Sequence, residues 1–143
     1  MALVGHNRLG KLLSMMIVVA ELWATVGVCP APASAGWDPD AIARADVLKL
    51  RTVCPGEGEY WFPVWLVVIE RHVFVRLGST AAGRVECNTA QTLGVEVGGQ
   101  KFDVRGVPSP EMANAVNDAM AQKYTADLLM RWFSHPLTLR LEP

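Results

Sequence analysis

The chain has 143 residues, of which 51% are hydrophobic, and its formal net charge is −1. This length allows one ordinary domain. The near-neutral charge excludes the clustered Lys and Arg side chains that bind nucleic acid through its phosphates, so we expect no nucleic-acid partner.

The N-terminal segment, residues 1–35, has the organisation of a secretory signal peptide. Basic side chains precede the apolar run 12–20, and Ala33-Ser34-Ala35 provides the small residues of a cleavage site. The run is shorter than the roughly 20 residues of a membrane span. We expect cleavage, export to the periplasm or the medium, and one mature domain over residues 36–143 that does not contact the membrane. The alternatives are an uncleaved anchor, or a cytoplasmic protein whose translation starts after this segment.

A short helix and three strands are expected first in the mature domain. Asp38-Pro39 supplies the cap and the first-position proline of a helix that should end near Asp46. Strands are predicted over residues 47–53, 61–69 and 72–77. The second is apolar enough to be buried on both faces. Glu70-Arg71 should reverse the chain tightly, although neither residue favours the positive φ of a two-residue turn, so a longer loop is the alternative.

The next segments favour a loop and a hairpin. Residues 78–84 are mostly small, and we expect a loop there that leads into a short helical stretch near residues 85–88. Residues 92–97 and 100–104 alternate in polarity on either side of Gly98-Gly99, which predicts two strands joined by a tight turn.

A second helix and a last strand complete the expected order. Ser109-Pro110-Glu111 has the pattern of a helix start. One face of this helix is apolar, and it carries Met112, Val116, Ala119 and Met120. The apolar surface should continue through Leu128, Leu129, Trp132 and Phe133. A strand over residues 137–141 would then close the sheet.

Two cysteines remain in the mature domain, Cys54 and Cys87. They could pair in an oxidising compartment if their Cα atoms came within about 7 Å. The spacing alone does not place them so closely, and two small buried thiols are the interpretation that we favour.

Several segments together resemble a little-characterised family of small bacterial proteins in the FMN-binding split-barrel, or pyridoxamine 5′-phosphate oxidase-like, group. The segments that carry the resemblance are residues 63–68, 73–76, 79–84 and 137–141. The resemblance extends over about residues 38–143. It implies a mainly β (α+β) fold, a six-stranded split β-barrel with flanking helices. It also implies a homodimer with a flavin at the subunit interface.

The resemblance also implies which residues would hold the cofactor. In such proteins basic and hydroxyl side chains near the first strand and after the third hold the flavin phosphate. The residues at these places are Arg51, Arg76, Ser79, Thr80 and Arg84. Arginine suits the task because its fork presents paired donors to a phosphate. Trp61 and Trp65 could line the ring pocket. Solvent-facing arginines, turn-forming hydroxyls and core tryptophans are the structural alternatives.

The leading functional hypothesis is an oxidoreductase that binds FMN or a deazaflavin and passes hydride to a small organic acceptor. The alternatives are a non-catalytic module that binds haem or another planar ligand, and an interaction domain with a vestigial groove. His72 and His135 are isolated in the sequence and predict no hydrolytic triad. No spacing of Cys, His and carboxylates predicts a metal site. The catalytic residues and the substrate stay unassigned.

Overall fold

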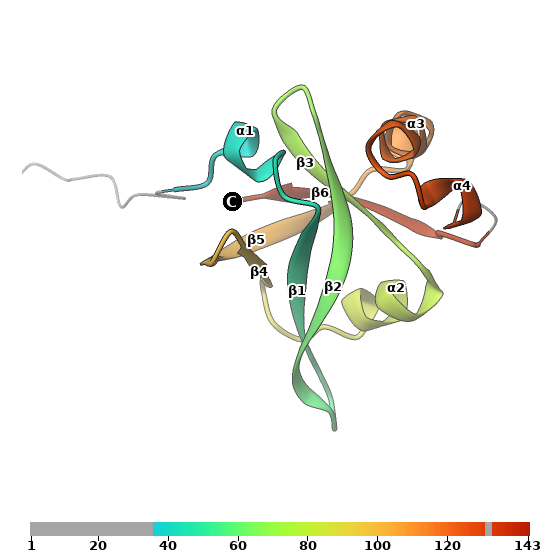
Figure 1. Cartoon of the computed structure of the whole chain (residues 1–143). Coiled ribbons are helices and arrows are strands. Elements are labelled where there is room, and N and C mark those ends of the chain that lie inside the picture. Colours follow the sequence, from blue (N-terminus) through green and yellow to red (C-terminus); the bar gives the residue numbers. More distant parts are fainter. Residues whose placement is uncertain (1–35, 131–132) are drawn as a thin grey trace, which may run out of the picture. The chain divides into compact units, whose positions relative to one another are not determined.

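A closed antiparallel barrel forms the centre of the computed structural model, which describes residues 36–130 and 133–143 (Figure 1). Within these residues the strands are β1 (Val47–Cys54), β2 (Gly58–Ile69), β3 (His72–Leu77), β4 (Leu93–Val97), β5 (Gln100–Pro108) and β6 (Leu137–Glu142). Their order around the barrel is β1-β2-β3-β6-β5-β4. The predicted six-stranded barrel is therefore confirmed, whereas the predicted signal segment lies outside the described residues.

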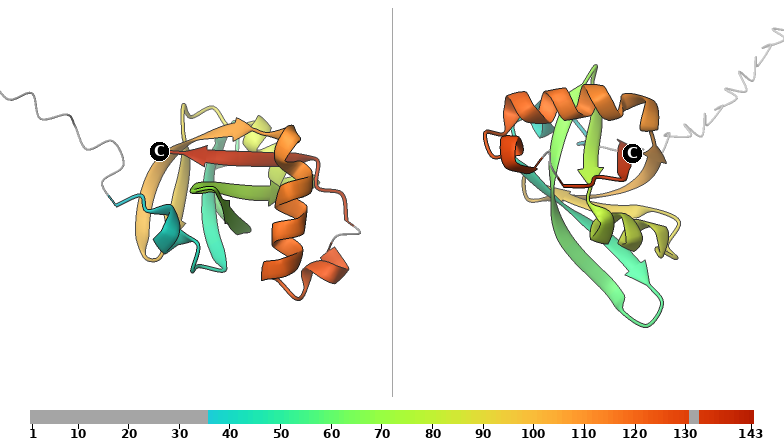
Figure 2. Two further views of the ribbon diagram at one scale, coloured as in Figure 1. Left: turned by 90° about the horizontal axis from the view of Figure 1, so that it is seen from above. Right: turned by 90° about the vertical axis from the view of Figure 1, so that its right-hand side faces the viewer.

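Helices flank the barrel in the same part of the chain. They are α1 (Pro39–Ile42), α2 (Ser79–Glu86), a 3₁₀ turn η1 (Pro110–Met112), α3 (Ala113–Lys123) and α4 (Asp127–Met130). Helix α3 lies across the outside of the barrel against β2 and β3 (Figure 2). None of the described helices has the length and apolar character to span a membrane.

Two apolar clusters explain why β2 is so hydrophobic. The first fills the barrel and contains Leu66, whereas the second lies between the barrel and α3 and contains Val67, Val116 and Met120. Successive strand residues point to opposite faces, so Leu66 faces the interior and Val67 faces the helix. Burial on both faces is confirmed for the C-terminal half of β2, which contains Leu66 and Val67. The half that begins at Gly58 extends beyond the covered region and is largely exposed.

The β2–β3 connection is the tight reversal that the sequence predicts. Ile69 pairs with His72, which leaves only Glu70 and Arg71 in the turn. Their φ angles are 49° and 64°, in the left-handed region that non-glycine residues rarely adopt. Pairing on both sides of the turn therefore outweighs the local preference of these two residues.

Two predicted helix boundaries are wrong. Helix α1 ends at Ile42 and not near Asp46, because the Lys123 ammonium donates to the carbonyls of Ala43 at 3.2 Å and Ala45 at 2.6 Å. This side chain gives those carbonyls partners that a longer helix would otherwise have to provide. Helix α2 begins at Ser79 within the predicted loop. Its alanines are good helix formers, and Ala82 is buried against the barrel.

The second predicted cap is also different from the expectation. Ser109 precedes η1, and its hydroxyl donates to the Val107 carbonyl at 3.2 Å and caps no helical N–H. The α-helix itself begins only at Ala113. Its expected apolar face is confirmed, because Val116 and Met120 are fully buried. Further along the chain, Leu129 and Phe133 are apolar as expected but exposed to solvent.

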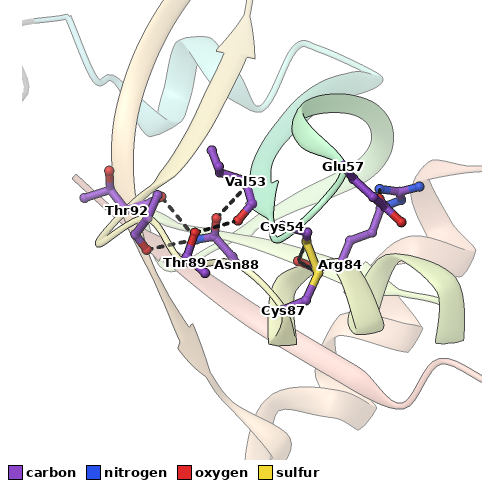
Figure 3. The surroundings of a disulfide bond; sticks show 9 residues. Val53, Cys54, Glu57, Arg84, Cys87, Asn88, Thr89 and Thr92 are labelled. Atoms are coloured by element: carbon purple, nitrogen blue, oxygen red, sulfur yellow. Dashed lines mark hydrogen bonds and ion pairs between the residues drawn. A yellow bond between two sulfur atoms is a disulfide. The ribbon is translucent and has the colours of Figure 1, made fainter.

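Cys54 and Cys87 form a disulfide, so the expectation of two free thiols is wrong (Figure 3). Cys54 ends β1 and Cys87 caps the C-terminus of α2, and their Cα atoms are 5.2 Å apart. The adjacent residues strengthen this junction: Val53 donates its N–H to the Asn88 side chain, and Thr89 donates its N–H to the Val53 carbonyl, both at 2.8 Å. The pairing depends on the contact between β1 and α2, which no local pattern indicates.

Candidate functional site

A groove of about 740 Å³ lies between β2, the junction of β3 with α2, and residues 133–135, which precede β6. This volume is in the usual range for sites that bind small organic molecules. Its lining is mostly apolar, with Trp65, Leu77, Met130 and Phe133 among the larger side chains. A small number of polar groups interrupt this surface, and their chemistry determines what the groove can bind.

Trp65 forms a rigid aromatic wall of the groove. Its ring stacks on Tyr124, with the centroids 4.6 Å apart and the planes 7° from parallel. The Tyr124 hydroxyl oxygen lies 2.8 Å from the Asp46 carbonyl and 2.7 Å from the Leu66 carbonyl, and it accepts the Leu66 N–H at 3.2 Å. Burial raises the pKa of Tyr124, so the ring stays neutral. These contacts fix the orientation of both rings.

His135 lines the groove from the segment that precedes β6. Burial, followed by the neighbouring Arg76 charge, lowers the pKa of its imidazole below the ordinary value of 6.5. The ring is therefore neutral at pH 7, and a neutral imidazole has a nitrogen lone pair that can bind a metal. The sequence alone predicts an isolated histidine here, because its cationic neighbour Arg76 comes from β3, far away in the chain.

Arg76 reaches the groove from β3, but its charge is already compensated. Its side chain is only 4% exposed and forms an ion pair with Asp127, which is fully buried at the start of α4. A second N–H group donates to the Asn117 side chain on α3 at 2.9 Å. The guanidinium thus joins β3 to two helices, and any ligand phosphate would compete with a buried carboxylate for it.

Arg51 does not line the groove. It lies on β1 between two acidic side chains, and its guanidinium nitrogens are 2.9 Å from Asp103 and 3.6 Å from Glu59. The same guanidinium lies 5.8 Å from the centroid of the Trp61 ring. Trp61 is therefore part of this charged surface, away from the groove lining.

Arg84 lies in the last turn of α2 and is also absent from the groove lining. Its guanidinium is 2.7 Å from Glu57 and stacks 3.9 Å above the centroid of the Tyr60 ring. Figure 3 shows the Arg84 and Glu57 side chains beside the disulfide. Each of the three arginines considered for a phosphate therefore has a carboxylate partner.

Ser79 and Thr80 do line the groove, as the first residues of α2. Gly78 occupies the cap position with an extended backbone and provides no side-chain cap. The structure therefore brings Trp65, Arg76, Ser79 and Thr80 together at the groove and leaves Arg51 and Arg84 outside it. Over residues 36–130 and 133–143, no three His, Cys, Asp or Glu side chains gather in a way that could hold a metal ion.

The barrel and its helices define the class of the protein as a six-stranded split barrel with flanking helices. No model of a protein family matches the sequence, and no curated protein matches it. Among solved structures, the chain is similar to HutZ, described as the heme storage protein from Vibrio cholerae. The TM-score is 0.53 at 15% sequence identity, and the match covers 70% of this chain and 82% of HutZ. At this identity the likeness supports the fold alone.

Proposed function

We propose that the groove binds haem or a similar planar ligand, and that the protein is a binding module of the split-barrel class. The observation that carries the proposal is His135, a neutral imidazole in a mostly apolar groove. Haem has a large apolar ring and an iron atom that accepts histidine as an axial ligand. The description of HutZ as a heme storage protein supports the same choice.

The other groove residues fit such a ligand. The Trp65 ring, held flat against Tyr124, offers a surface for a planar macrocycle. The Ser79 and Thr80 hydroxyls at the start of α2 can donate to the carboxylates that haem carries at one edge. In this proposal His135 would hold the iron, the aromatic and aliphatic lining would exclude water, and the hydroxyls would orient the polar edge.

An FMN- or deazaflavin-dependent oxidoreductase is the second candidate. Ser79 and Thr80 favour it, because their hydroxyls and the start of α2 could contact a phosphate. The three paired arginines weigh against it. A phosphate bound to Arg76 would compete with Asp127 for the guanidinium. Asp127 would then be a buried carboxylate without a charged partner, which costs a large amount of free energy. The flavin hypothesis therefore ranks below haem.

Titration of the purified protein with haem tests the proposal. We expect a shifted Soret band for the wild type that His135→Ala weakens strongly, because the imidazole that would hold the iron is lost. His72→Ala is the matched control, since His72 is exposed at the β2–β3 turn and absent from the groove lining. Equal haem spectra for the two variants would contradict the role of His135.

A parallel titration with FMN separates the two candidates. We expect no change in flavin fluorescence at concentrations that saturate the protein with haem. Tight FMN binding without haem binding would replace the haem proposal with the flavin one. A protein that binds neither ligand would support the interaction domain with a vestigial groove.

A further inference from the structure

The two cysteines of the Cys54–Cys87 disulfide differ in exposure. Cys54 is only 5% exposed at the end of β1, whereas Cys87, at the C-terminal cap of α2, is an exposed residue. A thiol cleaves a disulfide by attacking one of its sulfur atoms, so access decides which sulfur reacts. Cys87 is therefore the side from which a reductant reaches this bond, and exposed disulfides are the labile ones.

The structure already holds an acceptor for the reduced thiols. The Arg84 carbonyl oxygen lies 3.4 Å from Cys54 Sγ and 3.3 Å from Cys87 Sγ (Figure 3). A thiol S–H is a weak donor and can bond to this oxygen. Beside it, the Val53 N–H donates to the Asn88 side chain at 2.8 Å, a bond that does not depend on the disulfide. The end of β1 therefore keeps its neighbours when the disulfide opens.

Helix α2 is too short to be stable by itself. It has eight residues, fewer than the roughly 12–15 that an isolated helix needs, and only Ala82 among them is buried. The Arg84–Glu57 ion pair also connects α2 to the β1–β2 hairpin, but 59% of the Glu57 side chain is exposed, and exposed pairs contribute little. Reduction of the disulfide removes the covalent attachment of α2 to β1, so we expect the helix to loosen.

The other end of α2 forms a wall of the groove. Ser79, Thr80 and Ala81, the first three residues of the helix, line it. In the first turn the Ala82 N–H donates to the Gly78 carbonyl at 2.8 Å. Because a helix of this length forms and melts cooperatively, losing the attachment at one end also affects the residues at the other. The redox state of the disulfide is thereby coupled to the groove wall.

We propose that Cys87 is a thiol–disulfide exchange site and that reduction of the disulfide weakens ligand binding in the groove. A thiolate of a dithiol reductant attacks Cys87 Sγ, the S–S bond breaks, and Cys54 leaves as a thiolate that takes up a proton. The second thiol of the reductant then displaces the Cys87 sulfur, so the reductant is oxidised to a disulfide and the protein is reduced to two thiols. The effect on haem rests on the proposed function, whereas the exchange itself does not.

Reduction of the folded wild type by dithiothreitol, without denaturant, tests the exchange site. We expect the rate, followed by mass after alkylation of the thiols, to rise in proportion to the dithiothreitol concentration, because the reagent attacks the folded protein. A rate that levels off at the rate of global unfolding, measured in urea, would overturn the proposal. The sulfur atoms would then be reached only in the unfolded chain.

Two single-cysteine variants identify the reacting sulfur. Cys54→Ala leaves Cys87 free, and Cys87→Ala, the matched control, leaves Cys54 free. With glutathione disulfide we expect the Cys54→Ala variant to form a mixed disulfide about tenfold faster or more, because reactivity follows exposure. Thermal melting verifies that both variants are folded. Equal rates, or a faster reaction of Cys54, would overturn the assignment to Cys87.

Hydrogen exchange and a haem titration measure the coupling to the groove. The oxidised wild type is compared with the Cys54→Ala, Cys87→Ser variant, which represents the reduced state. We expect faster exchange of the α2 amides in the variant, unchanged exchange of the α3 amides, and haem affinity lower by about tenfold. Unchanged exchange in α2, or equal haem affinity of the two proteins, would overturn the coupling. Failure of the wild type to bind haem, with α2 loosened in the variant, would instead contradict only the haem proposal.

Discussion

His135 lines the candidate site, and burial lowers the pKa of its imidazole. Its lowered pKa arises first from burial and then from the Arg76 charge, whereas Asp127 and a hydrogen bond to the Phe133 carbonyl act in the opposite direction. The folded protein therefore favours the neutral ring, whereas the unfolded chain has a histidine of ordinary pKa. This single residue connects pH to both stability and ligand binding.

Haem binding should be constant from pH 8 to about 6.5 and should weaken only at lower pH. Below the lowered pKa of His135 a proton competes with the iron for the imidazole, so affinity should fall about tenfold for each further pH unit. Soret titrations across this range measure the effect. Weakening that begins well above pH 6.5 would contradict the lowered pKa.

The lowered pKa of His135 also makes the free energy of unfolding depend on pH. Below about pH 7 the imidazole of the unfolded chain, with its ordinary pKa of 6.5, binds protons that the folded protein does not, so stability falls with the pH until the folded imidazole is protonated as well. Urea unfolding of the wild type and His135→Ala isolates the effect, because the variant lacks the titrating group. We expect the stability difference between the two proteins to change with pH only in this window.

Helix α2 depends on its ends more than on its own packing. Ala82 is its only buried residue, and Gly83 lowers its intrinsic helix propensity. The disulfide at Cys87 and the contacts of Asn88 and Thr89 with Val53 attach its C-terminal end to β1. Its first residues line the groove, so the crosslink helps to position one groove wall.

Removing the disulfide should lower the free energy of unfolding by about 3–4 kcal/mol, because the bond closes a loop of 33 residues in the unfolded chain. The variant is Cys54→Ala with Cys87→Ser, and urea denaturation measures the change. A weaker haem affinity should accompany it if α2 moves. A reducing agent should destabilise the wild type to the same degree and leave the variant unaffected; equal stability of wild type and variant would contradict this account.

The exposed apolar side chains are concentrated beside the groove. Among the described residues, Leu129 is 74% exposed and Phe133 is 65% exposed, and Val47 and Met130 are also exposed at the groove rim. A domain of this size leaves much of its apolar surface uncovered, and association is a common way to bury it. We propose that a second copy of the chain covers this surface.

Sedimentation at micromolar concentration should therefore show a homodimer. Phe133→Asp should shift the equilibrium towards the monomer, because it places a charge in an apolar contact. Tyr60→Asp is the control, since Tyr60 is also exposed but lies near the β1–β2 turn, outside the groove lining. A wild-type monomer, or equal effects of the two substitutions, would contradict this interface.

Export is also a property of the whole molecule, and we propose it on two grounds. The sequence predicts cleavage after Ala35, and disulfides such as Cys54–Cys87 persist mainly in oxidising compartments. The mature protein should begin at or next to Gly36, which intact-mass analysis of exported protein measures. A full-length cytoplasmic product would contradict the proposal.

The sequence by itself determined most of the barrel. Alternating polarity predicts the β4–β5 hairpin, and the apolar run of β2 predicts burial on both faces, because side-chain periodicity is a local property. The small residues of α2 show no such periodicity, so the sequence predicts a loop where the helix in fact begins at Ser79. Only the tertiary structure decided which distant side chains meet. Arg76 and Asp127 are 51 residues apart, and Cys54 and Cys87 are 33 apart. Closure of the barrel and docking of its helices bring such groups together, and no local pattern records those contacts.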